Sequence, residues 1–285
     1  MKNKACKILF LIILVVFFSC NKENKYKMDN LNHNTIMILG HRGMGELYKY
    51  PGNTAEAILP VIGIGADGTE IDIQMTKDSV LVLYHSDLLD ARTTCTGKIS
   101  NKNWSEIKNC NYNLTWALVP LCTVDSLFGL IENLNDYYFS FDVKLDGDMV
   151  DNHEYKKTFL RAIKAIDDKY NMSENIIIEG EKDLLLLGRS LGLTNKECVV
   201  RAGPIEKSIE YAVEYNFFCV GAETDVSEAI VKDAHNKGIR FMVWNAKNSI
   251  GNFEAIDKNV DIIQTDAPIH ILQQLNRYDY EYQIP

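Results

Sequence analysis

The sequence has no Cys-x-x-Cys pair, although it contains 7 cysteines among 285 residues. Structural zinc sites and thiol redox motifs place cysteines at that spacing, so neither kind of site is indicated. No cluster of lysine and arginine occurs after residue 19. Because nucleic-acid backbones are bound by basic surfaces, we expect no nucleic-acid partner.

A hydrophobic run long enough to cross a bilayer is also missing. The uninterrupted apolar run from Ile8 to Phe18 is too short, since a spanning helix needs about 20 apolar residues. Three lysines precede this run, and Ser19 and Cys20 follow it. This order is typical of a secretion signal over residues 1–19, and a retained membrane anchor is the weaker interpretation.

The end of this segment resembles a bacterial lipoprotein signal, because small Ser19 precedes Cys20 and polar residues 21–25 follow. Bulky Phe17 and Phe18 depart from that pattern. The resemblance implies that Cys20 is lipidated and that residues 20–34 tether the protein to the cell envelope. Which membrane face displays the protein, and whether it binds other proteins, stays open.

The mature chain is acidic and has ample material for a core. Removal of residues 1–19 takes away three lysines and no acid, which moves the formal charge from −9 to −12. With 46% hydrophobic residues, residues 35–285 can form a single domain with a large core.

Two pairs of the remaining cysteines have different surroundings. Cys198 and Cys219 lie inside apolar, strand-like runs and are interpreted as buried thiols. Cys95 and Cys110 flank a loop-like stretch of an exported chain. A disulfide and two free thiols both fit that pair, because spacing alone does not fix connectivity.

From residue 35 onward, short apolar runs alternate with amphipathic segments. The runs predict eight strands: Ile36 to Gly40, Gly68 to Met75, Tyr138 to Lys144, Asn175 to Glu179, Cys198 to Ala202, Phe218 to Glu223, Ile239 to Trp244 and Asp261 to Thr265. Strands that alternate with helices indicate parallel βα units, and eight units indicate a closed (β/α)8 TIM barrel, an α/β fold.

Helical spacing supports this alternation. Apolar residues recur every three to four positions in Tyr155 to Tyr170, and Ile205 to Tyr215 repeats the pattern. The segment Ser227 to Lys237 ends at a glycine, which is typical of a helix C-terminus. Asn53, with Glu56 three residues later, is predicted to cap another helix. The long stretch Ser86 to Ser126 is expected to be a loop that covers the barrel mouth or shapes specificity.

Glu70 and Asp72 are the first candidates for chemistry. Residues two apart in a strand point to the same face, so both carboxylates point the same way. Like charges held together require a cation, and hard divalent ions prefer carboxylate oxygens. The alternative is a pair of solvated acids, which the buried face formed by Ile71 and Ile73 disfavours.

Further groups follow other strands. Asp142 offers a third carboxylate, and Lys144 on the same face can either neutralise a phosphate oxygen or pair with Asp142. His41 and His85 follow apolar runs as well, and two histidines near a cation fit the acid and base of phosphoryl transfer.

The combined motifs resemble the glycerophosphodiester phosphodiesterases. The strings that carry the resemblance are His41-Arg42-Gly43, Pro51-Gly52-Asn53-Thr54-Ala55-Glu56-Ala57, Gly65 to Asp78 with Glu70-Ile71-Asp72, His85, Arg92-Thr93-Thr94-Cys95-Thr96-Gly97, Val119-Pro120-Leu121, Trp244 and Gln264-Thr265-Asp266-Ala267-Pro268. They occur in the family's order and span the whole folded body from Ile36 to His270.

This resemblance implies a TIM barrel that binds one divalent cation, Ca²⁺ or Mg²⁺. The family roles carried over are metal ligands at Glu70, Asp72 and Asp142, the acid/base pair at His41 and His85, phosphate contacts at Arg42 and Lys144, and a substrate-pocket wall at Trp244. The implied reaction hydrolyses glycerophosphodiesters to glycerol 3-phosphate and an alcohol through a cyclic phosphate.

Three positions depart from the family pattern: Gly52 stands where Glu is usual, Ser86 where Asp is usual, and Asp142 where Glu is usual. The Asp142-x-Lys144 pair is similar to the sphingomyelinase D branch, so cleavage of phospholipid head groups is an alternative activity. Gly52 and Ser86 favour a further alternative, a non-catalytic lipoprotein that binds phosphodiesters. Both histidines and all three carboxylates are nevertheless retained.

Overall fold

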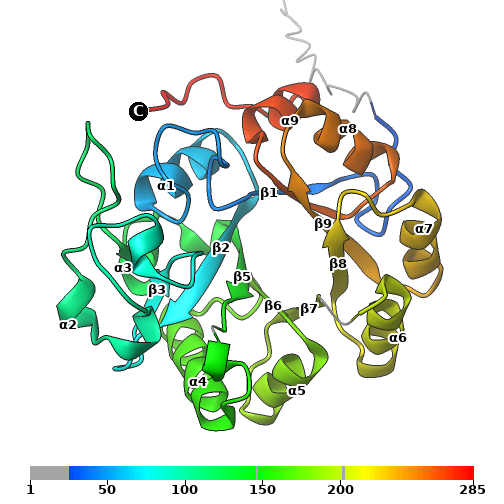
Figure 1. Ribbon diagram of the computed structural model, residues 1–285. Helices are drawn as coiled ribbons and strands as arrows, with labels where there is room; N and C mark the ends of the chain where they lie inside the picture. The colour runs from blue at the N-terminus through cyan, green and yellow to red at the C-terminus, as the bar shows by residue number, and fades with distance from the viewer. Residues whose placement is uncertain (1–25, 146, 201–202) are drawn as a thin grey trace, which may run out of the picture.

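The computed structural model describes residues 26–145, 147–200 and 203–285. The predicted signal segment 1–19 and Cys20 lie outside these residues. Within them, eight parallel strands form a closed ring with helices around it (Figure 1). The ring closes because β1 pairs with both β10 and β2. The predicted (β/α)8 TIM barrel is therefore confirmed.

All eight strands of the ring match predicted strands, with ends that differ by a few residues. The ring consists of β1 (Met37–Gly40), β2 (Gly68–Met75), β5 (Tyr138–Val143), β6 (Ile176–Gly180), β7 (Lys196–Val199), β8 (Cys219–Glu223), β9 (Arg240–Ala246) and β10 (Ile262–Thr265). The largest difference is in β7, which begins at Lys196 instead of Cys198. The apolar pattern did not indicate this start, because β7 begins with the charged residues Lys196 and Glu197. The carboxylate of Glu197 forms an ion pair with Arg189.

The helices of the described chain lie outside the ring or in the connections between strands. They are α1 (Ala55–Gly63), α2 (Trp104–Ile107), α3 (Val124–Phe128), α4 (His153–Tyr170), α5 (Lys182–Ser190), α6 (Ile205–Tyr215), α7 (Glu228–Asn236), α8 (Ser249–Asp257) and α9 (Pro268–Gln274). Four short 3-10 helices are η1 (Leu89–Ala91), η2 (Ile99–Asn101), η3 (Leu134–Asp136) and η4 (Gly147–Met149). None of the helices in these ranges has the length and apolar character that crossing a membrane requires.

Alternation along each strand divides the core into two layers. Outward-facing side chains such as Ile71, Ile73 and Phe141 join the large cluster between the strands and the helices. Inward-facing Leu39 and Met242 belong to a smaller cluster inside the ring, together with buried Cys198 and Cys219. Toward the carboxyl ends of the strands, which we call the upper end of the barrel, the same interior face is polar, and the candidate site lies there.

The segment after β2 is more than the loop expected for Ser86 to Ser126. We call residues 81–123 the excursion. In it, β3 (Leu81–Leu83) runs antiparallel to the end of β2, and β4 (Cys122–Thr123) pairs with β3. The excursion has its own small core, in which Tyr84, Ile99 and Tyr112 are buried. A disulfide joins Cys95 to Cys110 within it.

The position of β3 decides where the chain re-enters the site. One edge of β2 pairs with β5 as far as Ile73, whereas β1 occupies the other edge only at Gly68 and Thr69. β3 therefore uses the edge of β2 that β1 leaves free, and it brings the backbone N–H of Tyr84 to 3.0 Å from the carbonyl oxygen of Asp72.

Residues 26–34, in the predicted tether, lie against the rest of the protein. Met28 is buried, and the N–H of Leu31 donates to Asp261 Oδ1 at 2.7 Å. The same carboxylate contacts His235 Nε2 through Oδ2 at 2.7 Å. His235 thus has a structural contact away from the site. Through Asp261, residues 26–34 are held near the start of β10.

The excursion yields a prediction about stability. Replacing Cys95 and Cys110 together by serine should lower the free energy of unfolding by about 3 kcal/mol, because a cross-link over a sequence separation of 15 restricts the unfolded chain. Urea denaturation measures this loss. Dithiothreitol should cause a similar loss in the wild type and no further loss in the double variant; equal midpoints in all samples would contradict the prediction.

Candidate active site

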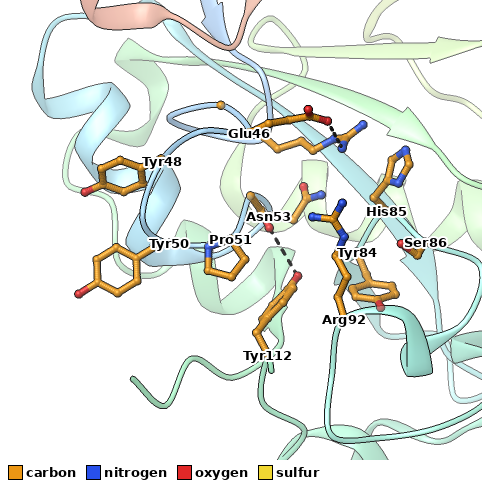
Figure 2. A pocket seen from close by; sticks show the side chains of 13 residues that line it. Glu46, Tyr48, Tyr50, Pro51, Asn53, Tyr84, His85, Ser86, Arg92 and Tyr112 are labelled. Carbon is orange, nitrogen blue, oxygen red and sulfur yellow. Dashed lines mark hydrogen bonds and ion pairs between the residues drawn. The ribbon is translucent and has the colours of Figure 1, made fainter. Parts of the chain in front are cut away.

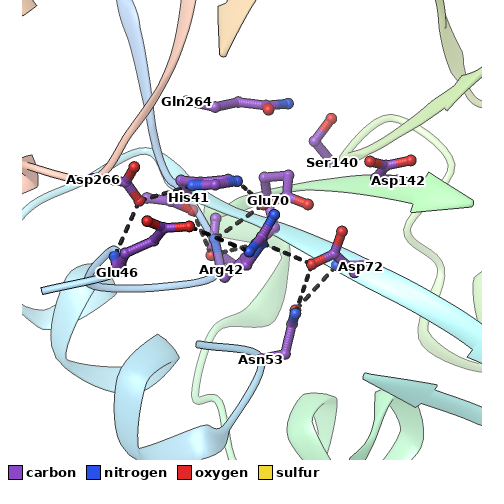
Figure 3. A network of polar contacts seen from close by, with 12 residues as sticks. His41, Arg42, Glu46, Asn53, Glu70, Asp72, Ser140, Asp142, Gln264 and Asp266 are labelled. Atoms are coloured by element: carbon purple, nitrogen blue, oxygen red, sulfur yellow. Dashed lines mark hydrogen bonds and ion pairs between the residues drawn. The ribbon is translucent and has the colours of Figure 1, made fainter. Parts of the chain in front are cut away.

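Three carboxylates meet inside the upper end of the barrel (Figure 3). Glu70 and Asp72 come from the inward face of β2, and Asp142 comes from β5, where it lies opposite Asp72 in the strand register. One oxygen from each lies within 4.8 Å of the others. Glu70 is 2% exposed and Asp72 is 1% exposed, so the two acids of β2 are not solvated.

Two cationic side chains flank Asp72. Lys144 Nζ lies 3.0 Å from Asp72 Oδ1 and also pairs with Asp142. Arg42 Nε lies 2.9 Å from the other oxygen of this carboxylate, Oδ2. The ion pair between Lys144 and Asp142, one of the two alternatives for this lysine, is therefore present, and it holds the ammonium group among the carboxylates.

The two acids of β2 respond differently to these surroundings. Burial raises the pKa of Asp72, but the charges of Lys144 and Arg42 more than offset it, and the net pKa is below its ordinary value. Burial and the neighbouring Asp72 charge raise the pKa of Glu70 well above its ordinary value. Glu70 is thus the carboxylate whose ionisation most requires an additional cation.

His41 lies directly after β1 and is oriented by a second residue. Its Nδ1 lies 2.7 Å from Asp266 Oδ1, and its Nε2 lies 3.8 Å from Glu70 Oε2. Asp266 follows β10, the strand next to β1. Sequence reasoning did not select Asp266 as a site residue, although its place after a strand is the same signal that marked His41.

The turn after β1 also shapes the site. Arg42 has φ 55°, a left-handed conformation, and Gly43 has φ 100°. In this turn the backbone N–H of Arg42 donates to Glu70 Oε2 at 3.0 Å. Gly40 permits the turn, because a Cβ there would lie 2.1 Å from the carbonyl oxygen of Gly43.

His85 reaches the site by a different route from His41. It follows β3, which runs antiparallel to β2, and therefore does not lie at the carboxyl end of a ring strand. Its ring is exposed, yet partial loss of solvation lowers its pKa below the ordinary value despite the nearby Asp72 charge. The neutral imidazole is consequently favoured near pH 7.

The prediction that Asn53 caps a helix is wrong. The N-cap of α1 is Thr54, whose side chain accepts from the N–H of Ala57. Asn53 is 2% exposed and instead holds Asp72: its Nδ2 donates to Oδ2 at 2.7 Å, and its Oδ1 accepts from the backbone N–H of Asp72 at 3.0 Å. The local capping pattern did not reveal this contact, because its partner is 19 residues away.

Glu179, which ends the predicted strand Asn175 to Glu179, is a buried acid beside the cluster. Glu179 is 4% exposed, and its Oε1 accepts from Ser140 Oγ at 2.7 Å and from Gln264 Nε2 at 2.5 Å. Burial, with the nearby Asp142 charge, raises its pKa to about 7. The inward register of β6 next to β5 explains its burial beside the cluster.

A cleft of about 230 Å³ opens above the carboxylates. Trp244 on β9 lines it, as do His41, His85 and Lys144, so the structure brings together the sequence-predicted site residues of the barrel. Gly221 leaves room for the indole, because a Cβ there would lie 2.8 Å from Trp244 Cζ3. The remaining lining residues are Arg42, Glu46, Glu70, Asp142, Glu179, Val200, Glu223, Asn245, Lys247 and Gln264.

The donor set fits a hard divalent cation. Glu70, Asp72 and Asp142 supply oxygen ligands only, which Ca²⁺ and Mg²⁺ prefer. The buried Glu70 lacks a full counter-charge, as its raised pKa indicates. An ion at this position would relieve repulsion among the three carboxylates and lie beside Arg42 and Lys144. A cation with these two side chains can bind an anionic, phosphate-like group next to two imidazoles.

Comparisons with known proteins agree with this geometry. Residues 41–270 match the model of the glycerophosphoryl diester phosphodiesterase family. A protein named glycerophosphodiester phosphodiesterase from Caldanaerobacter subterraneus is 24% identical over 241 residues, which cover 81% of this chain and 94% of that protein. Human glycerophosphodiester phosphodiesterase 1 is 34% identical over 76 residues, which cover 27% of this chain and 22% of that protein.

Solved structures share the fold. A putative glycerophosphoryl diester phosphodiesterase from Silicibacter pomeroyi superposes with a TM-score of 0.75 at 18% identity, covering 89% of this chain and 96% of that one. A glycerophosphodiester phosphodiesterase from Parabacteroides distasonis gives a TM-score of 0.70 at 20% identity, covering 85% and 97% of the two chains.

Glu179 provides a test of the site electrostatics. A carboxyl whose pKa is about 7 in the folded state and 4.5 in its ordinary state binds its proton more tightly when folded, so stability should fall as pH rises between these values. In Glu179→Gln this contribution, on the order of 3 kcal/mol, should disappear. Urea denaturation from pH 4.5 to pH 8 measures the change.

Exposed Glu181 on the same connection supplies the matched control. Glu181→Gln should retain the pH dependence of the wild type. A Glu179→Gln variant whose stability falls with pH as steeply as the wild type would contradict the burial of a titrating carboxyl at this position.

Proposed function

This chain belongs to the glycerophosphoryl diester phosphodiesterase family, and on that premise we propose that it hydrolyses glycerophosphodiesters to glycerol 3-phosphate and an alcohol. The observation that carries the proposal is the buried carboxylate cluster formed by Glu70, Asp72 and Asp142, which lies beside two cationic side chains and opens into a cleft lined by two histidines.

In this proposal the three carboxylates hold one divalent cation, Ca²⁺ or Mg²⁺. The bound cation supplies positive charge that stabilises the phosphoryl oxygens as negative charge builds on them. Arg42 and Lys144 add charge at the same place, and their present contacts with Asp72 keep both groups at the cluster before substrate arrives. These two side chains bind and orient the phosphate group.

His41 and His85 exchange protons with the substrate. One takes the proton of a glycerol hydroxyl as its oxygen bonds to phosphorus, and the other gives a proton to the departing alcohol oxygen as its P–O bond breaks. Water then opens the cyclic phosphate with the two roles reversed, which yields glycerol 3-phosphate. Asp266 keeps the His41 ring oriented throughout, through its 2.7 Å contact with Nδ1.

Trp244 forms a wall of the cleft and would pack against the carbon side of the glycerol group. Gln264, whose amide is fixed by Glu179, and Asn245 offer polar contacts to its hydroxyls. The cleft of about 230 Å³ leaves room for a small substrate at the cluster.

Phospholipid head-group cleavage of the sphingomyelinase D type is the second candidate. Exposed apolar side chains favour it: Leu47, next to Glu46 in the cleft lining, is 90% exposed, and Trp116 is 55% exposed and packs on Tyr50 with ring centroids 5.2 Å apart. Such side chains can contact lipid. Asp142, in place of the family glutamate, favours the same branch.

A substrate panel tests the proposed activity. Wild-type protein with Ca²⁺ or Mg²⁺ should release choline from glycerophosphocholine, and EDTA should abolish the release because the carboxylates then lack their cation. His41→Ala should lower kcat/KM by roughly 10²–10⁴-fold, the usual contribution of a general acid or base. Exposed His153 on α4 supplies the control, and His153→Ala should match the wild type.

Other results of the panel would redirect the assignment. Full activity after EDTA treatment or in His41→Ala would contradict the mechanism. Cleavage of micellar phospholipid without cleavage of glycerophosphocholine would favour the second candidate. Tight binding of the diester without turnover would favour a non-catalytic phosphodiester-binding lipoprotein.

We also propose that the protein is exported and held at the cell envelope by a lipid on Cys20, which follows the signal-like segment. When the full chain is expressed in a bacterium, it should partition into the detergent phase of Triton X-114, because acyl chains favour an apolar phase. Cys20→Ser should move it to the aqueous phase. Identical partitioning of both proteins would exclude the lipid anchor.

A further inference from the structure

A second, smaller cavity lies beside the cleft (Figure 2). Its volume is about 60 Å³, enough for one small polar group. Arg42, Glu46 and His85 line both spaces and therefore form the wall between them. The rest of the cavity is lined by Gly45, Tyr48, Tyr50, Pro51, Gly52, Asn53, Tyr84, Ser86, Arg92 and Tyr112.

The side chains that line this cavity include two arginines, Arg42 and Arg92, and one acid, Glu46. Arg92 points into it from the excursion, as Figure 2 shows, and its guanidinium has no ion pair with any residue in the described ranges. Glu46 is the acidic residue among the lining side chains; its carboxylate is half exposed and lies 3.8 Å from Arg42 Nη1. Arg92 thus remains available to an incoming anion.

The backbone around Arg92 is fixed in place. Its carbonyl oxygen accepts from the N–H of Asn113 at 2.9 Å, and Thr93 pairs with Tyr112 in an antiparallel bridge. The Tyr112 hydroxyl reaches the carbonyl oxygen of Gly52 at 3.5 Å, so the excursion is held against the turn before α1. These contacts set the backbone position from which the Arg92 side chain extends toward the cavity.

Two small residues keep the cavity open and without further negative charge. Gly52 approaches Arg42 closely, and a Cβ at this position would lie 2.6 Å from Arg42 Cβ. Ser86 contributes a short neutral side chain next to His85. These are two of the positions that depart from the family pattern, where larger acids are usual. Because glycine and serine stand at these positions, neither position offers Arg92 a carboxylate partner.

The wall between the two cavities is where the phosphate of a diester would bind under the proposed function. In an in-line displacement the attacking and departing oxygens lie on opposite sides of phosphorus. The two arms of the substrate therefore extend in different directions, and the larger cleft, with Trp244 and Gln264, suits the glycerol arm. The small basic cavity is left for the departing alcohol.

We propose that this cavity binds the alcohol arm of the substrate and that Arg92 selects alcohols that carry an anionic group, such as a carboxylate. This inference rests on the proposed function and adds the substrate class. Arg92 forms a charge-assisted hydrogen bond with that group, which the planar guanidinium can make through two parallel N–H donors.

Glycerophosphoserine and glycerophosphoethanolamine are the matched probes, since they differ only in the carboxylate of the alcohol. Wild-type protein with Ca²⁺ or Mg²⁺ should have the higher kcat/KM for the serine diester. Arg92→Gln should lower the ratio of the two kcat/KM values by roughly tenfold to a hundredfold, the effect of losing one hydrogen bond to a charged group. Arg92→Lys should restore part of the ratio.

The control variant removes another positive charge from the excursion. Lys108 is exposed and does not line the cavity, so Lys108→Gln should keep the wild-type ratio. An unchanged ratio in Arg92→Gln would overturn the inference, including the case in which both substrates lose activity equally, because Arg92 would then act on the shared phosphate.

Failure of the proposed function gives a different result. If the wild type cleaves neither diester, isothermal titration calorimetry with the same two compounds decides the inference. Tighter binding of the serine diester by the wild type, with the difference lost in Arg92→Gln, would support the anion site. Equal dissociation constants in the wild type would overturn it.

Discussion

The repulsion among buried carboxylates is the constraint on which the rest of this site depends. Glu70 and Asp72 are nearly without solvent, and Asp142 joins them from the adjacent strand. Arg42 and Lys144 compensate Asp72, whose pKa falls, while the pKa of Glu70 rises well above its ordinary value. A folded chain that keeps this arrangement has a place for one more positive charge, and a divalent cation with a phosphate bound to it meets that requirement.

The barrel supplies the geometry that makes such crowding stable. Because side chains alternate along β2, Ile71 and Ile73 point outward into the core between strands and helices, and Glu70 and Asp72 point into the ring. The packing of the two isoleucines therefore holds the two acids in place. The second histidine does not come from the regular βα pattern. Because β2 extends beyond β1, its free edge accepts β3, and this hairpin returns the chain to the level of Asp72 before His85. The excursion that follows brings Arg92 beside the same wall.

Much of this could be predicted from local sequence patterns. Alternating apolar runs predicted all eight ring strands, and the spacing of Glu70 and Asp72 placed both on one face of their strand. Contacts between distant segments could not be derived in this way. Asn53 has the local pattern of a helix cap, but its partner is Asp72 on β2, and Glu179 is buried only because β6 lies beside β5. The core and strands of the excursion likewise depend on pairing with β2, which no local pattern specifies.

Isothermal titration calorimetry with Ca²⁺ and Mg²⁺ in the absence of substrate measures whether the three carboxylates bind a cation. We expect one binding event per chain for at least one of these ions, and its loss in Asp72→Asn and Glu70→Gln because each variant removes a negative charge from the cluster. Binding should persist in Glu181→Gln, whose exposed side chain lies outside the cluster. Absence of binding to the wild type, or equal binding by Asp72→Asn and the wild type, would contradict a cation site formed by these carboxylates.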